Sequence, residues 1–313
     1  MKKLLCLLLG LSSLFLLSSY FLIPDEIVIS DTEEIESSER IVSKYLQSRD
    51  HRLKWWPEIK SEASAKTDSL IYKQKNYVFQ NPSFNSQDIH ISAENLNLKS
   101  TMSWLPYSSK LIRLRWEASL PAGRNPVKRF VRYQQARRIK SDMTFIMEQY
   151  LAFITNPREV YGYDFKIQTV TDTLLATANF NSAAYPENAR IYREINKLKT
   201  HLKRQGVDVV NPPMLNISKN AQGRYQTTLA LPVGRRFQPD ESVLLRNMVP
   251  GNILVTEVKG GPKAISNGFR QMEVFMKDFR LSSPAIPFES LVTDRTTQTD
   301  SSKWITKIYY PIY

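Results

Sequence analysis

The sequence predicts an α+β protein with two domains behind a short apolar N-terminal segment. Three observations support this class. Residues 4–23 are uncharged and follow directly on Lys2 and Lys3. Residues 69–155 contain several strand-like runs and then one long helical pattern, whereas residues 165–313 contain the order strand, helix, strand, strand twice. The parts that we expect are residues 1–23, residues 24–158 and residues 159–313.

The N-terminal apolar segment, residues 4–23, is long enough to cross a bilayer. Twenty helical residues span roughly 30 Å, the hydrocarbon thickness of a membrane. We favour an uncleaved anchor because the run is long and no small-x-small cleavage site follows it; a cleaved signal peptide is the alternative. Lys2 and Lys3 place the N-terminus in the cytoplasm. We therefore predict a single-pass protein of the cell membrane, with both domains on the extracytoplasmic (periplasmic) side.

Residues 24–158 predict strands before a long helix. Residues 25–39 hold seven acidic side chains and no basic one, and a short helix and Trp55-Trp56-Pro57 follow. The strands expected from runs of apolar and β-branched residues are 69–80, 87–94, 96–104 and 110–118. A helix predicted over residues 135–155 has an apolar face of Ile139, Met143, Ile146, Tyr150 and Phe153.

This order of elements resembles the START-like family (SRPBCC, polyketide cyclase-like), whose fold is the helix grip. The resemblance covers residues 24–158 and implies an apolar cavity between the sheet and the long helix. Trp104, Trp116 and Met143 could line such a cavity. They could equally fill it as ordinary core, since aromatic residues at strand spacing are usually buried.

The first copy of the C-terminal repeat begins with a strand predicted over residues 165–180. Pro186 opens a helix, and Gly206 ends it as a C-cap. Two further strands are expected at residues 214–218 and 225–233. The first copy therefore predicts a βαββ unit.

The second copy has the same order. Residues 251–258 predict a strand, and Gly260-Gly261-Pro262 begins a helix, where the missing N–H of proline costs nothing. Residues 284–294 and 303–313 are apolar, β-branched and aromatic runs, and the polar residues 295–302 between them read as a hairpin loop.

The duplicated unit, Gly260-Gly261-Pro262, Pro287-Phe288-Glu289 and the terminal run with Ile308-Tyr309-Tyr310-Pro311 together resemble the GyrI-like, or effector-binding, domain. This domain also forms the ligand-sensing half of some bacterial transcription activators. The resemblance implies two βαββ units with a groove between them that binds small, often cationic, amphipathic molecules. With the START-like domain and the anchor in front, the chain resembles a set of bacterial membrane-anchored proteins.

The resemblance implies that the last strands hold the ligand with carboxylates and aromatic rings. The binding residues that we expect are Glu289, Lys307, Phe288, Trp304 and Tyr309. Glu289 matches an acidic position of the family, but Lys307 stands where many relatives have an acid. A lysine there repels a cation or pairs with Glu289. Strand alternation places Lys307 and Tyr309 on one face and Trp304 on the other, so not all five can point inward.

A different interpretation of Glu289 and Lys307 is an ordinary solvated cross-strand pair, worth about 0.2–1 kcal/mol. Catalysis proposed for some relatives relies on a carboxylate, so Lys307 also argues against hydrolysis.

The formal net charge is +13, and residues 110–140 contain ten Lys or Arg and one acid. Nucleic acid is disfavoured as a partner because no helix-turn-helix precedes the domains and an anchor would export the chain. An anionic lipid surface and a solvated face, partly neutralised by residues 25–39, both remain open.

Metal and nucleophile motifs are scarce. The single cysteine, Cys6, lies in the apolar segment, which excludes disulfides and thiolate chemistry in the two domains. The three histidines are far apart, and no His-Glu-x-x-His, Walker loop or Gly-x-Ser-x-Gly is present. We therefore predict no metal, no cofactor and no catalytic residue.

The function that we predict is non-catalytic binding of a small amphipathic or apolar molecule in the cleft of the C-terminal domain. Two alternatives remain. One is a GyrI-like hydrolase of reactive small molecules that uses Glu289 as the acid–base group. The other is an envelope protein-interaction module whose cavities are filled.

Overall fold

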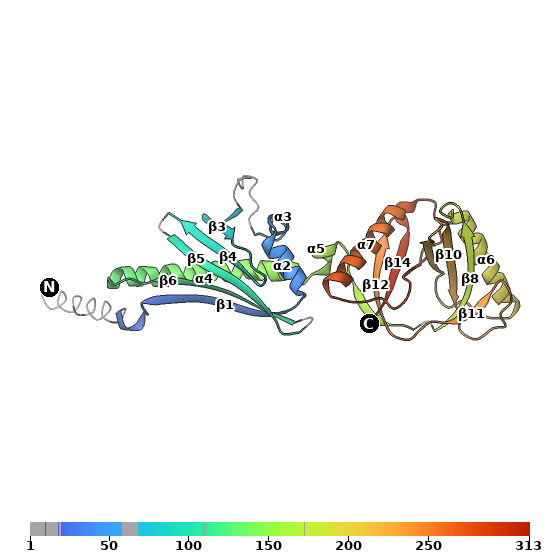
Figure 1. The fold of residues 1–313 in the computed structure, drawn as a ribbon, viewed down its shortest axis with the longest axis horizontal. Coiled ribbons are helices and arrows are strands. Elements are labelled where there is room, and N and C mark those ends of the chain that lie inside the picture. The colour runs from blue at the N-terminus through green and yellow to red at the C-terminus, as the bar shows by residue number, and fades with distance from the viewer. Residues whose placement is uncertain are drawn as a thin grey trace. The chain divides into compact units, whose positions relative to one another are not determined.

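The computed structural model describes residues 10, 18, 20–57, 68–94, 96–108, 111–171 and 173–313. The chain divides into two compact units, Met1–Asn156 and Pro157–Tyr313. Each unit has one antiparallel sheet with helices packed against it (Figure 1). The mixed α+β composition agrees with the predicted class. The assignment of the first unit to the START-like family stays a prediction.

The predicted anchor, residues 4–23, lies almost entirely outside the described residues. Of the helices that the structure describes, none has both the length and the apolar composition needed to cross a membrane. The predicted single-pass location is therefore contradicted. An apolar run supplies only the composition of a span, which also requires a continuous helix of about 20 residues.

The first unit contains a six-stranded sheet in the order β1-β6-β5-β4-β3-β2. Its strands are β1 (Glu26–Glu36), β2 (Ser69–Tyr72), β3 (Lys75–Gln80), β4 (Ser86–Ala93), β5 (Leu96–Pro106) and β6 (Leu111–Pro121). Its helices are α2 (Glu39–Gln47), α3 (Arg49–Arg52) and α4 (Pro126–Ile154). The strand predicted over residues 69–80 is two strands, because Lys73 and Gln74 adopt positive φ and make a two-residue hairpin turn.

Helix α4 begins nine residues before the predicted start. The side chain of Asn125 caps it by accepting hydrogen bonds from the N–H groups of Val127 and Lys128, and Pro126 occupies the first turn. The buried apolar face starts later than the helix, because the apolar residues of the first turns, Val127, Val131 and Tyr133, are exposed, while Arg129 is buried. Hydrophobic periodicity therefore located the buried part of α4 and missed its capped, solvated start.

The two tryptophans and the methionine considered for a cavity in the first unit belong to its buried core. Trp104, Trp116 and Met143 are at most 1% exposed. The indole N–H of Trp116 donates to the hydroxyl of Ser100 over 3.0 Å. In the part of the chain that the structure describes, these three side chains pack inside the unit.

The second unit contains an eight-stranded sheet in the order β11-β8-β10-β9-β13-β14-β12-β7. Its strands are β7 (Lys166–Thr169), β8 (Leu174–Ser182), β9 (Met214–Lys219), β10 (Tyr225–Pro232), β11 (Leu244–Asn247), β12 (Asn252–Lys259), β13 (Phe288–Ser290) and β14 (Ile305–Ile312). Its helices are α5 (Pro157–Tyr161), α6 (Asn188–Arg204), α7 (Pro262–Asp278) and a 3₁₀ turn (Ser301–Lys303).

The two predicted βαββ units lie side by side in this one sheet, and β9 of the first pairs with β13 of the second. The strand predicted over residues 165–180 is divided. Its first part, β7, pairs with β12 of the second copy, and its second part, β8, pairs with β10 of the first. The short strand β11 was not predicted, because four residues give too little periodicity.

Helix α6 ends at the C-cap predicted from Gly206. Gly206 has a φ of +64°. The N–H groups of Gly206 and Val207 donate to the carbonyls of Lys203 and Leu202, over 3.1 and 3.0 Å. This is the Schellman arrangement, which requires a left-handed residue and therefore favours glycine.

Candidate functional site

A cavity of about 380 Å³ lies in the second unit where the two βαββ copies meet. We call it the cleft. It is lined by Tyr185, Asn188, Ile191, Leu215, Asn216, Ile217, Pro262, Ile265, Ser266, Phe269, Glu273, Pro287, Glu289, Arg295, Trp304 and Tyr310. Helix α6 and strand β9 come from the first copy, and α7 and β14 from the second. The cleft therefore lies between the two copies of the repeat and is lined by residues of both.

Strand β13 places Glu289 in the wall of the cleft. The strand has only three residues, and Glu289 pairs with Leu215 of β9 on one side and with Ile308 of β14 on the other. Residues opposite each other in an antiparallel ladder share a face of the sheet. Glu289 therefore projects from the same face as Leu215 and Tyr310, which also line the cleft.

The carboxylate of Glu289 is paired inside the cleft with Arg295. Nη2 of Arg295 lies 2.9 Å from Oε2 of Glu289 and also donates to the hydroxyl of Thr306 over 3.0 Å. The side chains of Arg295 and Glu289 are 7% and 12% exposed. The guanidinium carbon lies 4.8 Å from the centre of the Trp304 ring. The guanidinium of Arg295 is therefore fixed by three contacts at once: the ion pair, the hydrogen bond to Thr306 and the face of the Trp304 ring.

The loop that carries Arg295 is anchored on both sides. The backbone N–H of Arg295 donates to the hydroxyl of Tyr192 on α6 over 2.8 Å. The N–H and hydroxyl of Thr296 bond the carboxylate of Asp294, and these bonds lower its pKa. The indole N–H of Trp304 donates to the carbonyl of Gln298 over 2.8 Å. The backbone of Arg295 is therefore held in place independently of Glu289.

Burial and the neighbouring charge of Arg295 shift the pKa of Glu289 in opposite directions. Desolvation raises its pKa above the ordinary value, and the positive charge and hydrogen bond of Arg295 oppose that shift. The phenol of Tyr310 donates to Oε1 of Glu273 over 2.9 Å, and burial raises the pKa of that phenol. The single O–H donor of Tyr310 is therefore taken up by Glu273.

The five residues expected to bind the ligand fall on two faces of the sheet. Glu289 and Trp304 line the cleft. Phe288 and Tyr309 stack on each other, with ring centres 5.0 Å apart and planes 11° apart. Phe288 belongs to the apolar cluster on the other face, with Tyr309 packed against it. Lys307 shares that face with Tyr309, opposite Ser290. A binding role for any of the five stays a prediction.

Arg295 is the residue that sequence reasoning missed. It lies in the polar run 295–302, which was read as a hairpin loop. A sequence signal did exist, because Thr293 and Asp294 precede Arg295 and threonine and aspartate favour side-chain-capped turns. Such a signal indicates a turn, but it does not indicate which side chain turns inward.

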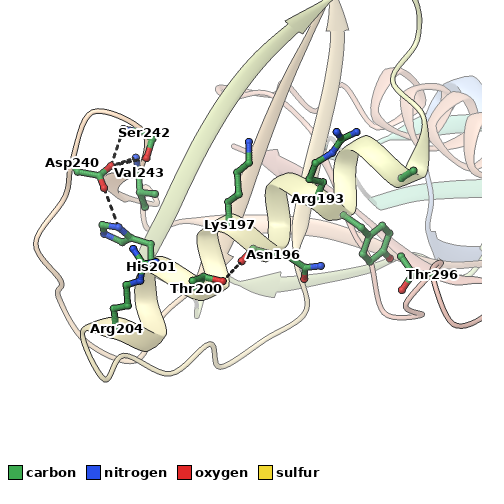
Figure 2. A pocket seen from close by; sticks show the side chains of 12 residues that line it. Arg193, Asn196, Lys197, Thr200, His201, Arg204, Asp240, Ser242, Val243 and Thr296 are labelled. Atoms are coloured by element: carbon green, nitrogen blue, oxygen red, sulfur yellow. Dashed lines mark hydrogen bonds and ion pairs between the residues drawn. The ribbon is translucent and has the colours of Figure 1, made fainter.

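A second, wider groove of about 680 Å³ runs along the exposed side of α6 (Figure 2). Arg193, Lys197 and Arg204 of α6 and Ser242 and Thr296 of the facing loops line it. All five side chains belong to exposed residues. We interpret this groove as a solvated basic surface, since exposed cations are well hydrated and hold ions weakly.

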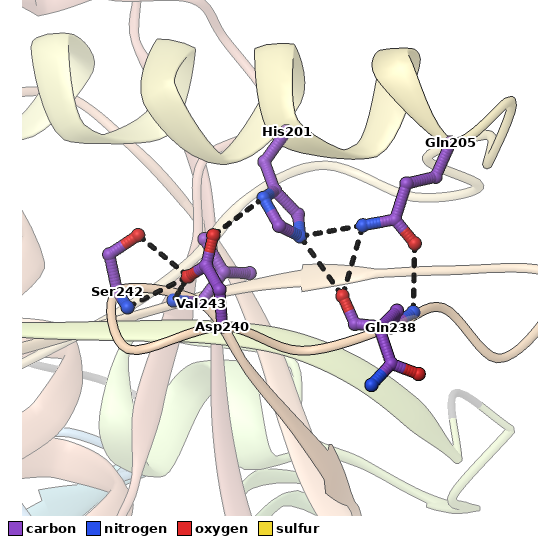
Figure 3. Close-up of polar contacts among 6 residues, drawn as sticks. All are labelled: His201, Gln205, Gln238, Asp240, Ser242 and Val243. Atoms are coloured by element: carbon purple, nitrogen blue, oxygen red, sulfur yellow. Dashed lines mark hydrogen bonds and ion pairs between the residues drawn. The ribbon is translucent and has the colours of Figure 1, made fainter.

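At one end of this groove His201 joins α6 to the loop after β10 (Figure 3). Nδ1 of His201 lies 3.0 Å from Oδ2 of Asp240, and Nε2 lies 2.9 Å from the side-chain nitrogen of Gln205. The amide of Gln205 exchanges two hydrogen bonds with the backbone of Gln238. The imidazole is occupied in fixing the loop and shows no free nitrogen directed at the groove.

No protein-family model and no curated protein matches the chain. Solved structures are similar to part of it. The C-terminal domain of EcmrR is 13% identical, with 48% of this chain and 98% of that chain covered and a TM-score of 0.42. SAV2435 bound to tetraphenylphosphonium is 14% identical, with 48% and 94% covered and a TM-score of 0.33. A hydrolase encoded by lin2189 from Listeria innocua is 12% identical, with 50% and 96% covered and a TM-score of 0.35. Likeness at this level assigns neither a family nor a ligand to this chain.

Proposed function

We propose that this chain binds a small, largely apolar aromatic molecule in the cleft of the second unit and releases it unchanged. The observation that carries the proposal is the cleft itself: a cavity of about 380 Å³ whose walls come from both copies of the repeat. Small-molecule sites are typically concave and mostly apolar, with a few placed polar groups. The GyrI-like resemblance of the sequence implies a ligand groove in the same place.

The lining of the cleft supports an aromatic ligand. Trp304, Phe269 and Tyr310 supply ring surfaces, and Ile217 and Ile265 supply aliphatic ones. Aromatic rings prefer offset or edge-to-face contacts with other rings, which adds to the free energy of burying their surface. The pair of Glu289 and Arg295 would orient a polar group of the ligand.

The two alternatives have less support. A hydrolase that uses Glu289 as its acid–base group needs that carboxylate free to exchange a proton, and Arg295 holds it. An interaction module with filled cavities does not need an open cleft. Binding and turnover of one aromatic probe distinguish ligand binding, hydrolysis and a protein-interaction module.

Isothermal titration of the full chain with 2-naphthamide, an uncharged aromatic amide, tests the proposal. The matched variants are Ser266→Trp and Lys263→Trp. Both residues are exposed on α7, but only Ser266 lines the cleft. We expect 2-naphthamide to bind the wild type and Lys263→Trp, and we expect Ser266→Trp to weaken binding at least tenfold by obstructing the cleft.

Chromatography of the probe after incubation completes the test. Release of 2-naphthoate that Glu289→Gln abolishes would support a hydrolase instead. Absence of binding to the wild type, or equal binding to both tryptophan variants, would contradict the proposed function.

A further inference from the structure

Arg295 occupies the place that a cationic ligand would take in the cleft. A cation is attracted by a buried carboxylate and by the face of an aromatic ring. In this structure the guanidinium of Arg295 lies 2.9 Å from Glu289 and 4.8 Å from the centre of the Trp304 ring. Both attractive features are therefore already used by a side chain of the protein.

The bonds of Arg295 leave part of its guanidinium unsatisfied. A guanidinium has five N–H donors. Both side-chain hydrogen bonds of Arg295 leave from Nη2, to Glu289 and to Thr306. Among the residues that the structure describes, the buried Nε has no hydrogen-bond partner. A buried donor without an acceptor is unfavourable. Arg295 lines the cleft, so its guanidinium lies beside any molecule bound there.

Displacing Arg295 would be costly for a cationic ligand. The side chain is 7% exposed, and its backbone N–H is bonded to Tyr192 on α6. A cation that took over Glu289 would leave Arg295 buried without its counter-charge and close to a second positive charge. Specificity against a ligand class can come from such a repulsive element as well as from attraction.

The geometry points to a specificity-determining role for Arg295: the cleft takes an aromatic compound that carries an oxygen acceptor, as a carboxylate or an amide carbonyl, and excludes aromatic cations. This inference rests on the proposed function, since it names the class of ligand for the same cleft. Glu273 is the other acidic group in the lining; it is exposed, and its carboxylate accepts the bond from Tyr310. Glu289 is the other buried charge of the lining, and its pairing with Arg295 offsets it, so Arg295 supplies the hydrogen-bond donors of the pair.

Three probes with one ring system test the inference on the full chain at neutral pH: 2-naphthoate, 2-naphthamide and 2-naphthylmethylammonium. Isothermal titration gives the affinity of each. We expect the wild type to bind the carboxylate and the amide at least tenfold more tightly than the ammonium. Since all three share the naphthalene ring, this difference reports the polar group alone.

Two variants of Arg295 and one matched control identify the residue responsible. Arg295→Met keeps an apolar chain of similar length and should weaken the carboxylate and amide at least tenfold while it strengthens the ammonium. Arg295→Lys keeps the charge and should still exclude the ammonium. The control, Arg270→Met, removes an exposed arginine of α7 outside the cleft and should change none of the three affinities.

The outcomes separate this inference from the proposed function. Equal affinities for all three probes, or tightest binding of the ammonium by the wild type, would overturn the role of Arg295 while the cleft remains a binding site. If no probe binds the wild type or Arg295→Met, the proposed function fails. Circular dichroism checks the folding of each variant. If Arg295→Met does not fold, the order of the three probe affinities in the wild type and in Arg295→Lys tests the role of Arg295.

Discussion

At the scale of single residues, the pair of Glu289 and Arg295 dominates the electrostatics of the cleft. A buried ion pair adds little net stability, because desolvation of both charges offsets their attraction. Removing one partner is costly, since it leaves the other charge buried and unpaired. The pair therefore contributes more to which molecules the cleft accepts than to how stable the fold is.

The raised pKa of Glu289 makes the free energy of unfolding depend on pH. Its pKa is raised in the folded state, so the folded state binds the proton more tightly than the unfolded state, whose carboxyl has the ordinary value of 4.5. The free energy of unfolding therefore falls as pH rises from 4.5 through the folded pKa. Arg295→Met removes the charge that opposes the shift. We expect its free energy of unfolding to fall further than that of the wild type, by about 1.4 kcal/mol for each added pKa unit.

Urea unfolding of Arg295→Met over a pH series measures this effect, with Arg295→Met/Glu289→Gln as the control. The double variant lacks the titrating group and should lose the additional slope. Identical slopes in the two variants would show that Glu289 does not titrate as its burial requires.

At the scale of elements, the close approach of α7 to the sheet shapes one wall of the cleft. Gly268 is buried, and a Cβ at this position would lie 2.8 Å from methyl carbons of both Ile308 and Val258. Ile265 and Phe269 on the same helix line the cleft. The glycine therefore sets how near these two side chains come to the strands.

Gly268→Ala tests this packing. The added methyl should force α7 away from β12 and β14, and overpacking of this kind costs about 1–3 kcal/mol. The gain in helix propensity offsets about 1 kcal/mol of that cost. We expect a net loss of up to about 2 kcal/mol in urea unfolding, together with weaker binding of 2-naphthamide. Arg270→Ala, exposed on the same helix, should stay within about 0.5 kcal/mol of the wild type. A Gly268→Ala variant as stable as this control would disprove the packing argument.

At the scale of the whole molecule, each unit has its own sheet and core. The core clusters of the second unit are built from its own residues, such as Leu198, Leu229 and Ile253. The cleft is also lined entirely by residues of that unit. A unit of this size buries enough surface to fold alone.

The fragment 157–313 should therefore fold cooperatively and bind 2-naphthamide with the affinity of the full chain. Urea unfolding and isothermal titration of the fragment measure both properties. A fragment that folds but binds more than tenfold more weakly would show that residues outside it contribute to the site.

The elements that sequence reasoning located well are those with a strong local signal. Helix α7 starts at Pro262 as predicted, and α6 ends before Gly206, because these residues act through their own backbone preferences. Strand β13 is much shorter than the apolar run 284–294 predicted. An apolar run shows that residues can be buried, but pairing with neighbouring strands decides how many of them form a ladder.

The sequence by itself determined the α+β class and the order of the duplicated elements, and it named Glu289 and Trp304 among five candidate binding residues without deciding which of the five line the cleft. Only the tertiary structure decided that β9 and β13 pair and join the two copies, and that Arg295 folds back onto Glu289. Periodicity and caps are local, so they can be read from neighbouring letters. Strand pairing and the burial of a loop side chain depend on contacts between distant residues, which no local pattern encodes.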